Sequence, residues 1–344
     1  MASETSIIDR AFGALAGMAI GDALGMPSQT LTRQQIHQHY GQITGFVVPF
    51  DDHPVSHGLR AGQITDDTEQ ALMLAQRLIA GRGRINEAQL ASDLLAWEAD
   101  VKARGFRDLL GPSSRAALDA MLAGAPISQT GRGGTTNGAA MRIAPIGIAT
   151  PIEPLAGFVD QVELACRMTH NTGEAIAGAA AVAAIISCGL EGRDFDKSVR
   201  TAVLAAKEGQ KRGYAAGDGD MAARVRDALS LARRVKDINE LVGVTGTSVA
   251  SHQSIPAAFG IVSLADGNPW KAALIAANVG DDTDTIGAMA GAMAGACSGS
   301  AALPKAAVEF VLTANALPLQ ETARRLLKLR KDVTARAGLQ DVKS

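Results

Sequence analysis

Two short acidic segments, one near each end of the chain, carry side chains that suit divalent cations. Residues 65–68 read TDDT and residues 281–285 read DDTDT. Carboxylate and hydroxyl oxygens are the ligands that hard cations such as Mg²⁺ and Mn²⁺ prefer in proteins. We interpret the two segments as halves of a single metal site, which requires the two ends of the chain to meet in space.

Helix capping is the alternative explanation of either segment. Each leads into an apolar run typical of a helix, and Asp or Thr at a helix N-terminus stabilises it by roughly 1 kcal/mol. A cap needs one such residue, however, and crowded carboxylates repel one another unless a cation neutralises them. The metal interpretation is favoured, with Mg²⁺ or Mn²⁺ ahead of Ca²⁺. An EF-hand is excluded, because Ile286 and Met293 stand where that loop needs ligands.

The segment 131–138, GRGGTTNG, is a second candidate for chemistry. We expect a flexible loop whose backbone N–H groups could surround a phosphate, although it matches neither G-x-G-x-x-G nor a P-loop, and a plain surface loop is the alternative. His170 precedes an apolar run, where a structural role is the commoner one. The chain contains no G-x-S-x-G or H-E-x-x-H motif, which argues against the commoner serine hydrolases and zinc proteases.

The spacing of apolar residues predicts an all-α fold. They recur at i, i+3, i+4 and i+7, while sustained alternation of Val, Ile and Thr is almost absent. Glycines recur every four residues in 13–25 and again in 287–295, which places them on one helix face and permits close helix contact. The small-residue helices 11–25, 175–189 and 286–296 are therefore expected at the centre. The charged, amphipathic helices 86–102, 221–236 and 319–333 are expected at the periphery.

Three stretches without a clear helical pattern, 26–63, 128–137 and 237–256, are predicted to be irregular. Long irregular loops in a compact domain are usually either functional or disordered. A site built from both ends of the chain favours one domain over residues 1–344. Its core is expected at about 10–300, followed by C-terminal helices at about 301–340.

Composition excludes several classes of protein. A formal charge of −2 gives no electrostatic footprint for nucleic acid, and the basic stretch 324–331 has the spacing of a solvated helix face. The apolar run 175–190 is too short to span a bilayer, and the N-terminus lacks a basic region typical of a signal peptide. Three cysteines without C-x-x-C spacing suit a reducing cytoplasm, the location we expect.

Five motifs in order match a known family. They are GDALG at 21–25, TDDT at 65–68, NGAAMR at 137–142, Thr169-His170, and GDDTDTI at 280–286. Together they resemble the ADP-ribosylglycohydrolase family, which includes the dinitrogenase reductase-activating glycohydrolase. The resemblance runs from about residue 10 to about residue 300. It implies a single compact orthogonal multi-helix bundle with a dinuclear Mg²⁺ or Mn²⁺ centre in a cleft.

The resemblance also implies an activity and a set of site residues. In the family the cations hold the ribose hydroxyls and organise water, and a glycosidic bond at C1 of an ADP-ribosylated or ribosylated substrate is cleaved. Carried over to this sequence, the metal ligands are Thr65, Asp66, Asp67, Asp282, Asp284 and Thr285. The residues expected at the reacting bond are Asp66, Asp67 and Gln29. The residues expected to bind substrate are Gly133, Gly134, Thr135, Asn137, Gly138, Met141, Arg142 and His170.

Two positions depart from the family pattern. Gln29 stands at or near the place of an acidic residue, and an amide cannot take a proton. The base would then be Asp66, Asp67 or a hydroxide held by the cations. Asp281 stands where the family usually has glycine, and it could be an indirect hydrogen-bond acceptor, an extra ligand or a solvated residue.

Three functional hypotheses follow. The leading one is a metal-dependent glycohydrolase acting on an ADP-ribosyl or related ribosyl bond. The second is a hydrolase of a small nucleoside or other N-riboside, suggested by Gln29 and by an aromatic content of 3%. The third is a catalytically silent protein that binds ADP-ribose as a sensor. The sequence makes no prediction of the oligomeric state.

Overall fold

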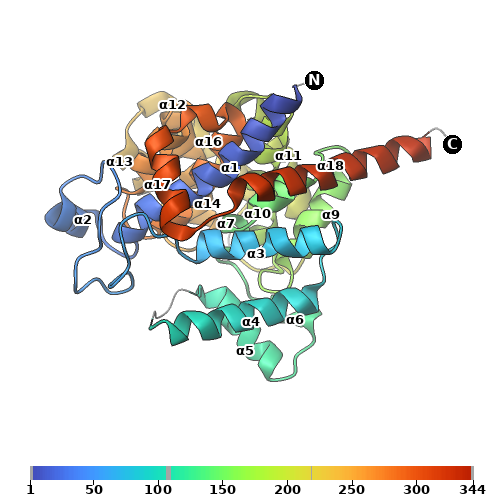
Figure 1. Cartoon of the computed structure of the whole chain (residues 1–344), viewed down its shortest axis with the longest axis horizontal. Helices are drawn as coiled ribbons and strands as arrows, with labels where there is room; N and C mark the ends of the chain where they lie inside the picture. Colours follow the sequence, from blue (N-terminus) through green and yellow to red (C-terminus); the bar gives the residue numbers. More distant parts are fainter. Residues whose placement is uncertain (1–2, 106–109, 218, 342–344) are drawn as a thin grey trace.

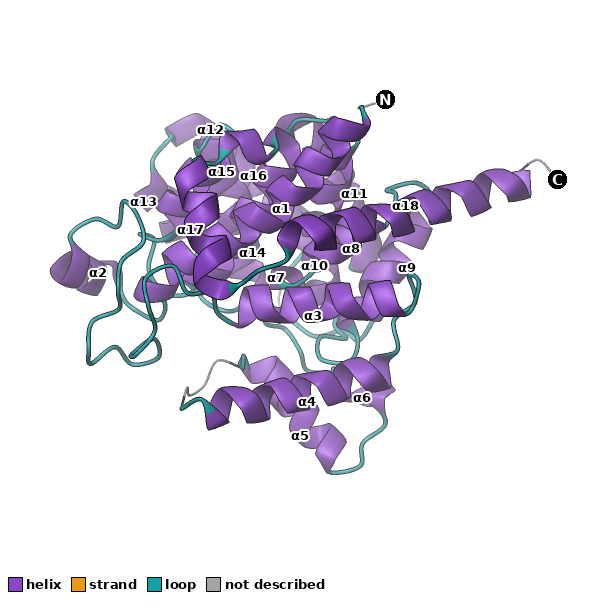
Figure 2. Ribbon diagram, in the orientation of Figure 1, coloured by secondary structure: helices purple, strands orange, loops and turns teal. Residues whose placement is uncertain are grey.

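The structure, a computed structural model, describes residues 3–105, 110–217 and 219–341, so the predicted domain 1–344 extends at both ends and at two internal points beyond the described residues. Within these ranges the chain forms helices and no strand, and two isolated β-bridges join loops (Figure 2). The predicted all-α fold class is confirmed. The helices are α1 (Glu4–Gly25), η1 (Met26–Ser28), α2 (Arg33–Tyr40), α3 (Asp66–Ala80), α4 (Glu87–Ala103), α5 (Pro112–Leu122), α6 (Ile127–Thr130), α7 (Gly138–Met141), α8 (Ala144–Ala149), α9 (Leu155–Cys166), α10 (Gly173–Leu190), α11 (Phe195–Gly209), α12 (Met221–Val235), α13 (Ile238–Thr245), α14 (Ser251–Leu264), α15 (Pro269–Ala276), α16 (Thr283–Ser298), η2 (Ser300–Ala302), α17 (Lys305–Asn315) and α18 (Leu319–Asp341).

The two glycine stripes pack against each other. α1 and α16 run antiparallel along their whole length, with Gly13 beside Gly295 and Gly17 beside Gly291. A Cβ atom at Gly17 would lie 2.2 Å from the carbonyl oxygen of Gly291, so any side chain there would push the backbones apart. The predicted close helix contact is confirmed. It joins the first and last parts of the chain at the centre of the fold (Figure 1).

α10 is the third central helix. Every residue of it is buried, and it contacts α11, α16 and α8. The expectation that the run 175–190 is too short to span a bilayer was wrong, because the helix extends to 18 residues and is long and apolar enough to cross a membrane. Its whole length nevertheless lies inside the fold. The predicted peripheral helices correspond to α4, α12 and α18, each of which keeps an exposed polar face. α4, α5 and α6 lie together on one side of α3 (Figure 1).

The prediction of an irregular stretch at 237–256 was wrong. α13 occupies its first part, and α14 begins at Ser251 with Pro256 in its second turn. A proline so near a helix start removes one backbone bond, which the burial of Ile255 and Phe259 offsets. The stretch 26–63 also contains η1 and α2, although most of it is irregular. The stretch 128–137 begins within α6 and continues as a loop from Gly131.

Candidate active site

The two acidic segments meet at the central helix pair. Both lie at helix N-termini as predicted, since α3 begins at Asp66 and α16 begins at Thr283. Because α1 and α16 are antiparallel, the C-terminal end of α1 lies beside the N-terminal end of α16, where Gly25 contacts the backbone of Asp284. The Asp67 Oδ2 atom accepts hydrogen bonds from Thr65 Oγ1 at 3.2 Å and Thr285 Oγ1 at 3.4 Å. Residues 218 positions apart thus share one carboxylate.

Asp22 of α1 anchors the first segment, a role that the sequence analysis missed. Its buried carboxylate accepts from the Thr65 backbone N at 2.9 Å and from Thr65 Oγ1 at 2.8 Å. It also accepts from the Thr68 backbone N at 3.1 Å and from Thr68 Oγ1 at 2.6 Å. Asp22 therefore caps α3 from another helix, and the side chain of Thr65 does not cap it. The signal in the sequence was an aspartate inside an apolar, glycine-spaced helix.

The carboxylates that do not cap a helix lie where the two acidic segments meet. Asp66 Oδ2 accepts from Gln70 Nε2 at 3.0 Å, and Asp284 Oδ1 accepts from the Thr285 backbone N at 3.0 Å. The Asp67 Oδ1 atom is buried and has no hydrogen-bond partner. A buried carboxylate oxygen without a partner is costly in free energy. Capping therefore does not explain Asp67.

Burial and mutual repulsion favour the protonated forms of these acids. Burial raises the pKa of Asp66, Asp67 and Asp284 well above the ordinary value for aspartate, and the neighbouring carboxylates raise it further. Burial raises the pKa of Asp22 and of Asp282 to about 6, against the lowering effect of their hydrogen bonds. The carboxylates on α1, α3 and α16 repel one another electrostatically. The site therefore attracts positive charge, whether protons or cations.

The second segment is held by the loop that precedes α7. Asn137 Nδ2 donates to Asp282 Oδ2 and, at 2.9 Å, to Ser254 Oγ of α14. Asp281 is exposed, with a φ of 62°, in the left-handed region that glycine adopts most easily. Its backbone pairs with Thr30 and Leu31. Of the three roles left open for Asp281, the geometry supports the solvated residue.

The donor set of this site is mixed. Among the described residues, no three Asp, Glu, His or Cys side chains converge in an arrangement that would hold a metal ion as it stands. The oxygens that meet here belong to carboxylates and also to the hydroxyl groups of Thr65 and Thr285. Mg²⁺ and Mn²⁺ accept both kinds of oxygen ligand.

The glycine-rich loop is ordered, contrary to the expected flexibility. The Gly131 carbonyl oxygen accepts from the Asn171 backbone N at 2.7 Å, and the Thr135 carbonyl oxygen accepts from the Ser251 backbone N at 3.0 Å. A Cβ atom at Gly134 would lie 2.2 Å from the Thr169 carbonyl oxygen, whereas one at Gly133 would meet no atom within 4 Å. A Cβ atom at Gly131 would lie 2.3 Å from the Arg167 carbonyl oxygen, and one at Gly138 would lie 2.9 Å from the His170 ring. Gly131 and Gly134 therefore serve backbone packing, Gly138 packs against the His170 ring, and Gly133 has open space at its Cβ position.

The remaining residues predicted to bind substrate lie at different depths behind this loop. Thr135 is half-buried, while Met141, Arg142 and His170 are buried. Thr136, which was not among the predicted residues, is also half-buried. Burial lowers the pKa of His170 well below its ordinary value, with a further contribution from Arg142, so the ring is neutral. Arg142 and His170 thus lie buried behind the loop and support it.

Gln29 is held in a fixed orientation. Its side chain is buried, and its Nε2 atom donates to Ser56 Oγ at 2.9 Å. Ser56 Oγ in turn donates to the Met26 carbonyl oxygen at 2.7 Å. Ser56, from the irregular stretch 26–63, was not predicted as a site residue. It fixes which end of the Gln29 amide is the donor.

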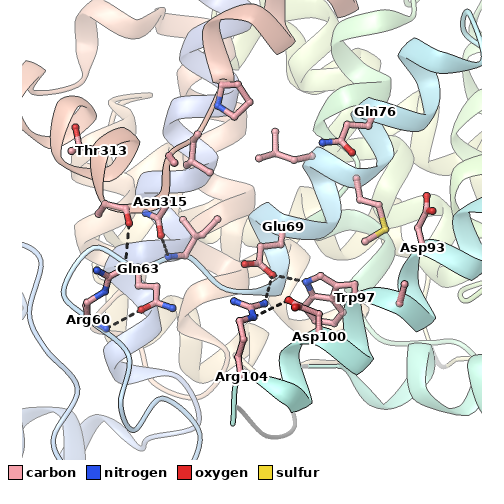
Figure 3. Close-up of a pocket in the computed structure, with 18 of the residues that line it drawn as sticks. Arg60, Gln63, Glu69, Gln76, Asp93, Trp97, Asp100, Arg104, Thr313 and Asn315 are labelled. Atoms are coloured by element: carbon pink, nitrogen blue, oxygen red, sulfur yellow. Dashed lines mark hydrogen bonds and ion pairs between the residues drawn. The ribbon is translucent and has the colours of Figure 1, made fainter.

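A pocket with a volume of about 860 Å³ lies elsewhere (Figure 3). It is lined by α3, α4, residues 313–318 and by Arg60, Gln63, Ile64 and Arg104. None of the predicted site residues lines it. Most of its charged groups are paired. Glu69 accepts from Trp97 Nε1 and approaches Arg104 at 3.5 Å, and Arg104 pairs with Asp100 at 2.9 Å. Arg77 also pairs with Asp93 at 2.5 Å. We therefore assign the chemistry to the carboxylate site.

Comparisons with known proteins agree with the five motifs. The family model described as ADP-ribosylglycohydrolase matches residues 3–336. The uncharacterized protein YegU of Escherichia coli (strain K12) is 34% identical over 94% of this chain and 98% of its own length. The ADP-ribosylarginine hydrolase Tri1 of Pseudomonas putida (strain GB-1) is 31% identical over 88% of this chain and 74% of its own. A solved structure titled ADP-ribosylglycohydrolase-related protein complex shares the fold, with a TM-score of 0.67 at 23% identity over 94% of this chain and 99% of that one.

Proposed function

Because this chain belongs to the ADP-ribosylglycohydrolase family, we propose that it hydrolyses the glycosidic bond of an ADP-ribosyl or related ribosyl group. The observation that carries the proposal is the convergence of the two acidic segments, in which Asp67 and Thr285 share a hydrogen bond across the α3 and α16 N-termini. A relative named as an ADP-ribosylarginine hydrolase supports an N-glycosyl bond as the target.

The residues of this site fit divalent cations, and we infer two Mg²⁺ or Mn²⁺ ions. A cation would give the unpartnered Asp67 Oδ1 atom a partner and would offset the repulsion that raises the pKa of the carboxyl groups. The adjacent hydroxyl groups would serve as further ligands. The ligands would be Thr65, Asp66, Asp67, Asp282, Asp284 and Thr285. Bound cations would supply charge neutralisation and polarise the ribose hydroxyls.

The protein's own groups supply the proton transfer and the positioning. In the proposed reaction, a water oxygen forms a bond to C1 of the ribose while the bond from C1 to the leaving atom breaks. The water proton passes to the carboxylate of Asp66 or Asp67 and then to the leaving group. The Gln29 Nε2 atom donates to Ser56, and the amide can only orient water or a hydroxyl group. Neighbouring carboxylates also stabilise the positive charge that develops on the sugar.

The test is hydrolysis of ADP-ribosylarginine by the purified chain with Mg²⁺, Mn²⁺ or chelator. We expect metal-dependent release of ADP-ribose, detected by chromatography, and loss of that release in Asp67→Asn. Absence of turnover with every ribosyl substrate and both cations would refute the proposed activity. Binding of ADP-ribose without turnover would instead support the sensor hypothesis.

The fixed amide of Gln29 favours a second candidate, the hydrolysis of a small N-riboside. An active site with a neutral group near the reacting bond differs from the acidic pattern expected of the family, which permits a different leaving group. The two candidates are separated by comparing kcat/KM for ADP-ribosylarginine with kcat/KM for free ribonucleosides. A preference for nucleosides would replace the first candidate with the second.

A further inference from the structure

A continuous hydrogen-bond chain connects the carboxylate site to the glycine-rich loop through the protein interior. From Asp66 it passes to Gln70 at 3.0 Å and to Arg142 at 3.0 Å. From Arg142 it continues to Thr169 Oγ1 at 2.6 Å and His170 Nδ1 at 2.7 Å. It ends where His170 Nε2 lies 3.0 Å from Thr136 Oγ1. The four residues between Asp66 and Thr136 are buried.

Arg142 fixes the direction of every bond in this chain. A guanidinium group donates and never accepts, so Gln70 Oε1 and Thr169 Oγ1 must be the acceptors. Gln70 then presents its amide N–H to Asp66. On the other side, among the hydrogen bonds of the described residues, the Thr169 hydroxyl hydrogen has one acceptor, His170 Nδ1. The ring proton of neutral His170 is therefore on Nε2, which donates to Thr136 Oγ1.

The direction of these hydrogen bonds determines the role of the Thr136 hydroxyl group. If its oxygen accepts from His170, its own hydrogen is left available to donate to another acceptor. Thr136 is half-buried, and the next residue, Asn137, donates to Asp282 in the carboxylate site. The two adjacent loop residues are thus tied to the two acidic segments, Asn137 directly and Thr136 through the chain from Asp66.

We propose that Arg142 is a positioning residue that orients the Asp66 carboxylate and, through Thr169 and His170, presents the Thr136 hydroxyl as a hydrogen-bond donor to an oxygen of the substrate. The inference rests on the proposed function for the identity of the ligand. The acceptor is an oxygen of a ribosyl diphosphate, either on the diphosphate or on the terminal ribose. Arg142 itself, buried behind the loop, acts through its neighbours.

The first experiment measures the His170 tautomer in the absence of ligand. In protein labelled with ¹⁵N-histidine, we expect NMR signals of a pyridine-type Nδ1 and a protonated Nε2, assigned by their loss in His170→Asn. Thr169→Val removes the donor to Nδ1 and should change the Nδ1 signal, while Thr169→Ser should preserve it. A proton on Nδ1 in the unsubstituted protein would overturn the proposed direction of the chain.

The second experiment measures the affinity for ADP-ribose and for ADP by calorimetry with Mg²⁺ present. Loss of one hydrogen bond to a ligand oxygen should weaken binding of ADP-ribose by about tenfold in Thr136→Val, whereas Thr136→Ser should restore it. A loss for ADP as well would place the acceptor on the diphosphate, and a loss for ADP-ribose alone would place it on the ribose. Unchanged affinity in Thr136→Val would overturn the donor role.

The two experiments test separate parts of the inference, the direction of the hydrogen bonds and the contact with the ligand. If the unsubstituted protein binds neither ADP-ribose nor ADP, the proposed function and the ligand-facing part of this inference are both wrong. The tautomer of His170 still decides whether Arg142 sets the direction of the hydrogen bonds from Gln70 to Thr136. Arg142→Lys, which keeps the charge but loses the forked donor, should also alter the His170 signals if the direction originates at Arg142.

Discussion

Gly21 of α1 and Gly287 of α16 contact each other directly through their backbones. A Cβ atom at Gly21 would lie 2.0 Å from the Gly287 carbonyl oxygen, and one at Gly287 would lie 2.4 Å from the Gly21 carbonyl oxygen. This contact lies within one helical turn of Asp22 and of Asp284. The distance between the two acidic segments is therefore set by two residues that have no side chain.

Substitution of this contact should separate the two helices. We expect Gly21→Ala to lower the free energy of unfolding by about 3 kcal/mol, because the new methyl group meets rigid backbone rather than a movable side chain. Chemical denaturation measures the change. Gly243→Ala in α13 is the control, since a Cβ atom there meets no atom within 4 Å and alanine should stabilise that helix by about 0.5–1 kcal/mol. Equal stability of Gly21→Ala and the unsubstituted protein would contradict the contact.

Cations should stabilise the fold through the carboxylate site. In chelator-treated protein, Mg²⁺ or Mn²⁺ at 100 times its Kd should add about 2.7 kcal/mol to the free energy of unfolding. Asp67→Asn removes one of several repelling carboxylates, so it should raise the Tm without cations and abolish the increase with them. Thermal unfolding measures both effects. The matched control is Asp281→Asn, whose exposed side chain should leave the increase intact.

An acidic residue at position 29 should reveal whether the chain keeps the family's pocket. Gln29→Glu places a carboxylate where the amide now donates to Ser56, at a cost of about 1 kcal/mol in stability. We expect kcat for ADP-ribosylarginine to increase, because a carboxylate can take a proton. Gln76→Glu, on the exposed face of α3, is the control. No increase in Gln29→Glu would indicate that the substrate differs.

The stability of the protein should depend on the protonation of His53. Its Nδ1 atom accepts from the backbone N atoms of Val55 at 3.2 Å and Ser56 at 2.8 Å, and burial lowers its pKa to about 4. Between pH 4 and 6.5 the unfolded state binds the proton more readily, so this contribution is complete above pH 6.5 and is lost as the pH falls toward 4. We expect a loss of about 2 kcal/mol between pH 7 and pH 5.

The raised pKa values of the aspartates act in the opposite direction. Asp22 and Asp282, each with a pKa of about 6, favour the folded state at low pH, and that contribution is lost as the pH rises through 6. The effect of His53 must therefore be measured as the difference between the unsubstituted protein and His53→Asn. His37→Asn, a histidine substitution on the exposed face of α2, is the control. Parallel pH profiles for His53→Asn and the unsubstituted protein would contradict the prediction.

Much of the fold follows from local patterns. The apolar spacing predicted the helices, and the repeated glycines predicted the close contact that α1 and α16 make. The stretch 237–256 was misjudged because its Gly, Ser, Thr and Pro residues have weak local preferences, and α13 and α14 form there through burial of their apolar faces. The glycines of 131–138 likewise suggest a flexible loop from sequence alone, although Gly131 and Gly134 permit backbone contact with residues 167–171.

The sequence by itself determined the all-α class, the family and the positions of the two acidic segments, because periodicity and motif spacing are properties of the chain alone. Only the tertiary structure decided which atoms meet. Asp22, 43 residues before Thr65, caps α3 because helix packing brings it there. In the same way, the link from Asp66 through Arg142 to Thr136 exists only because three separate segments converge. The direction of a hydrogen bond depends on the partner, and partners distant in sequence are set by packing.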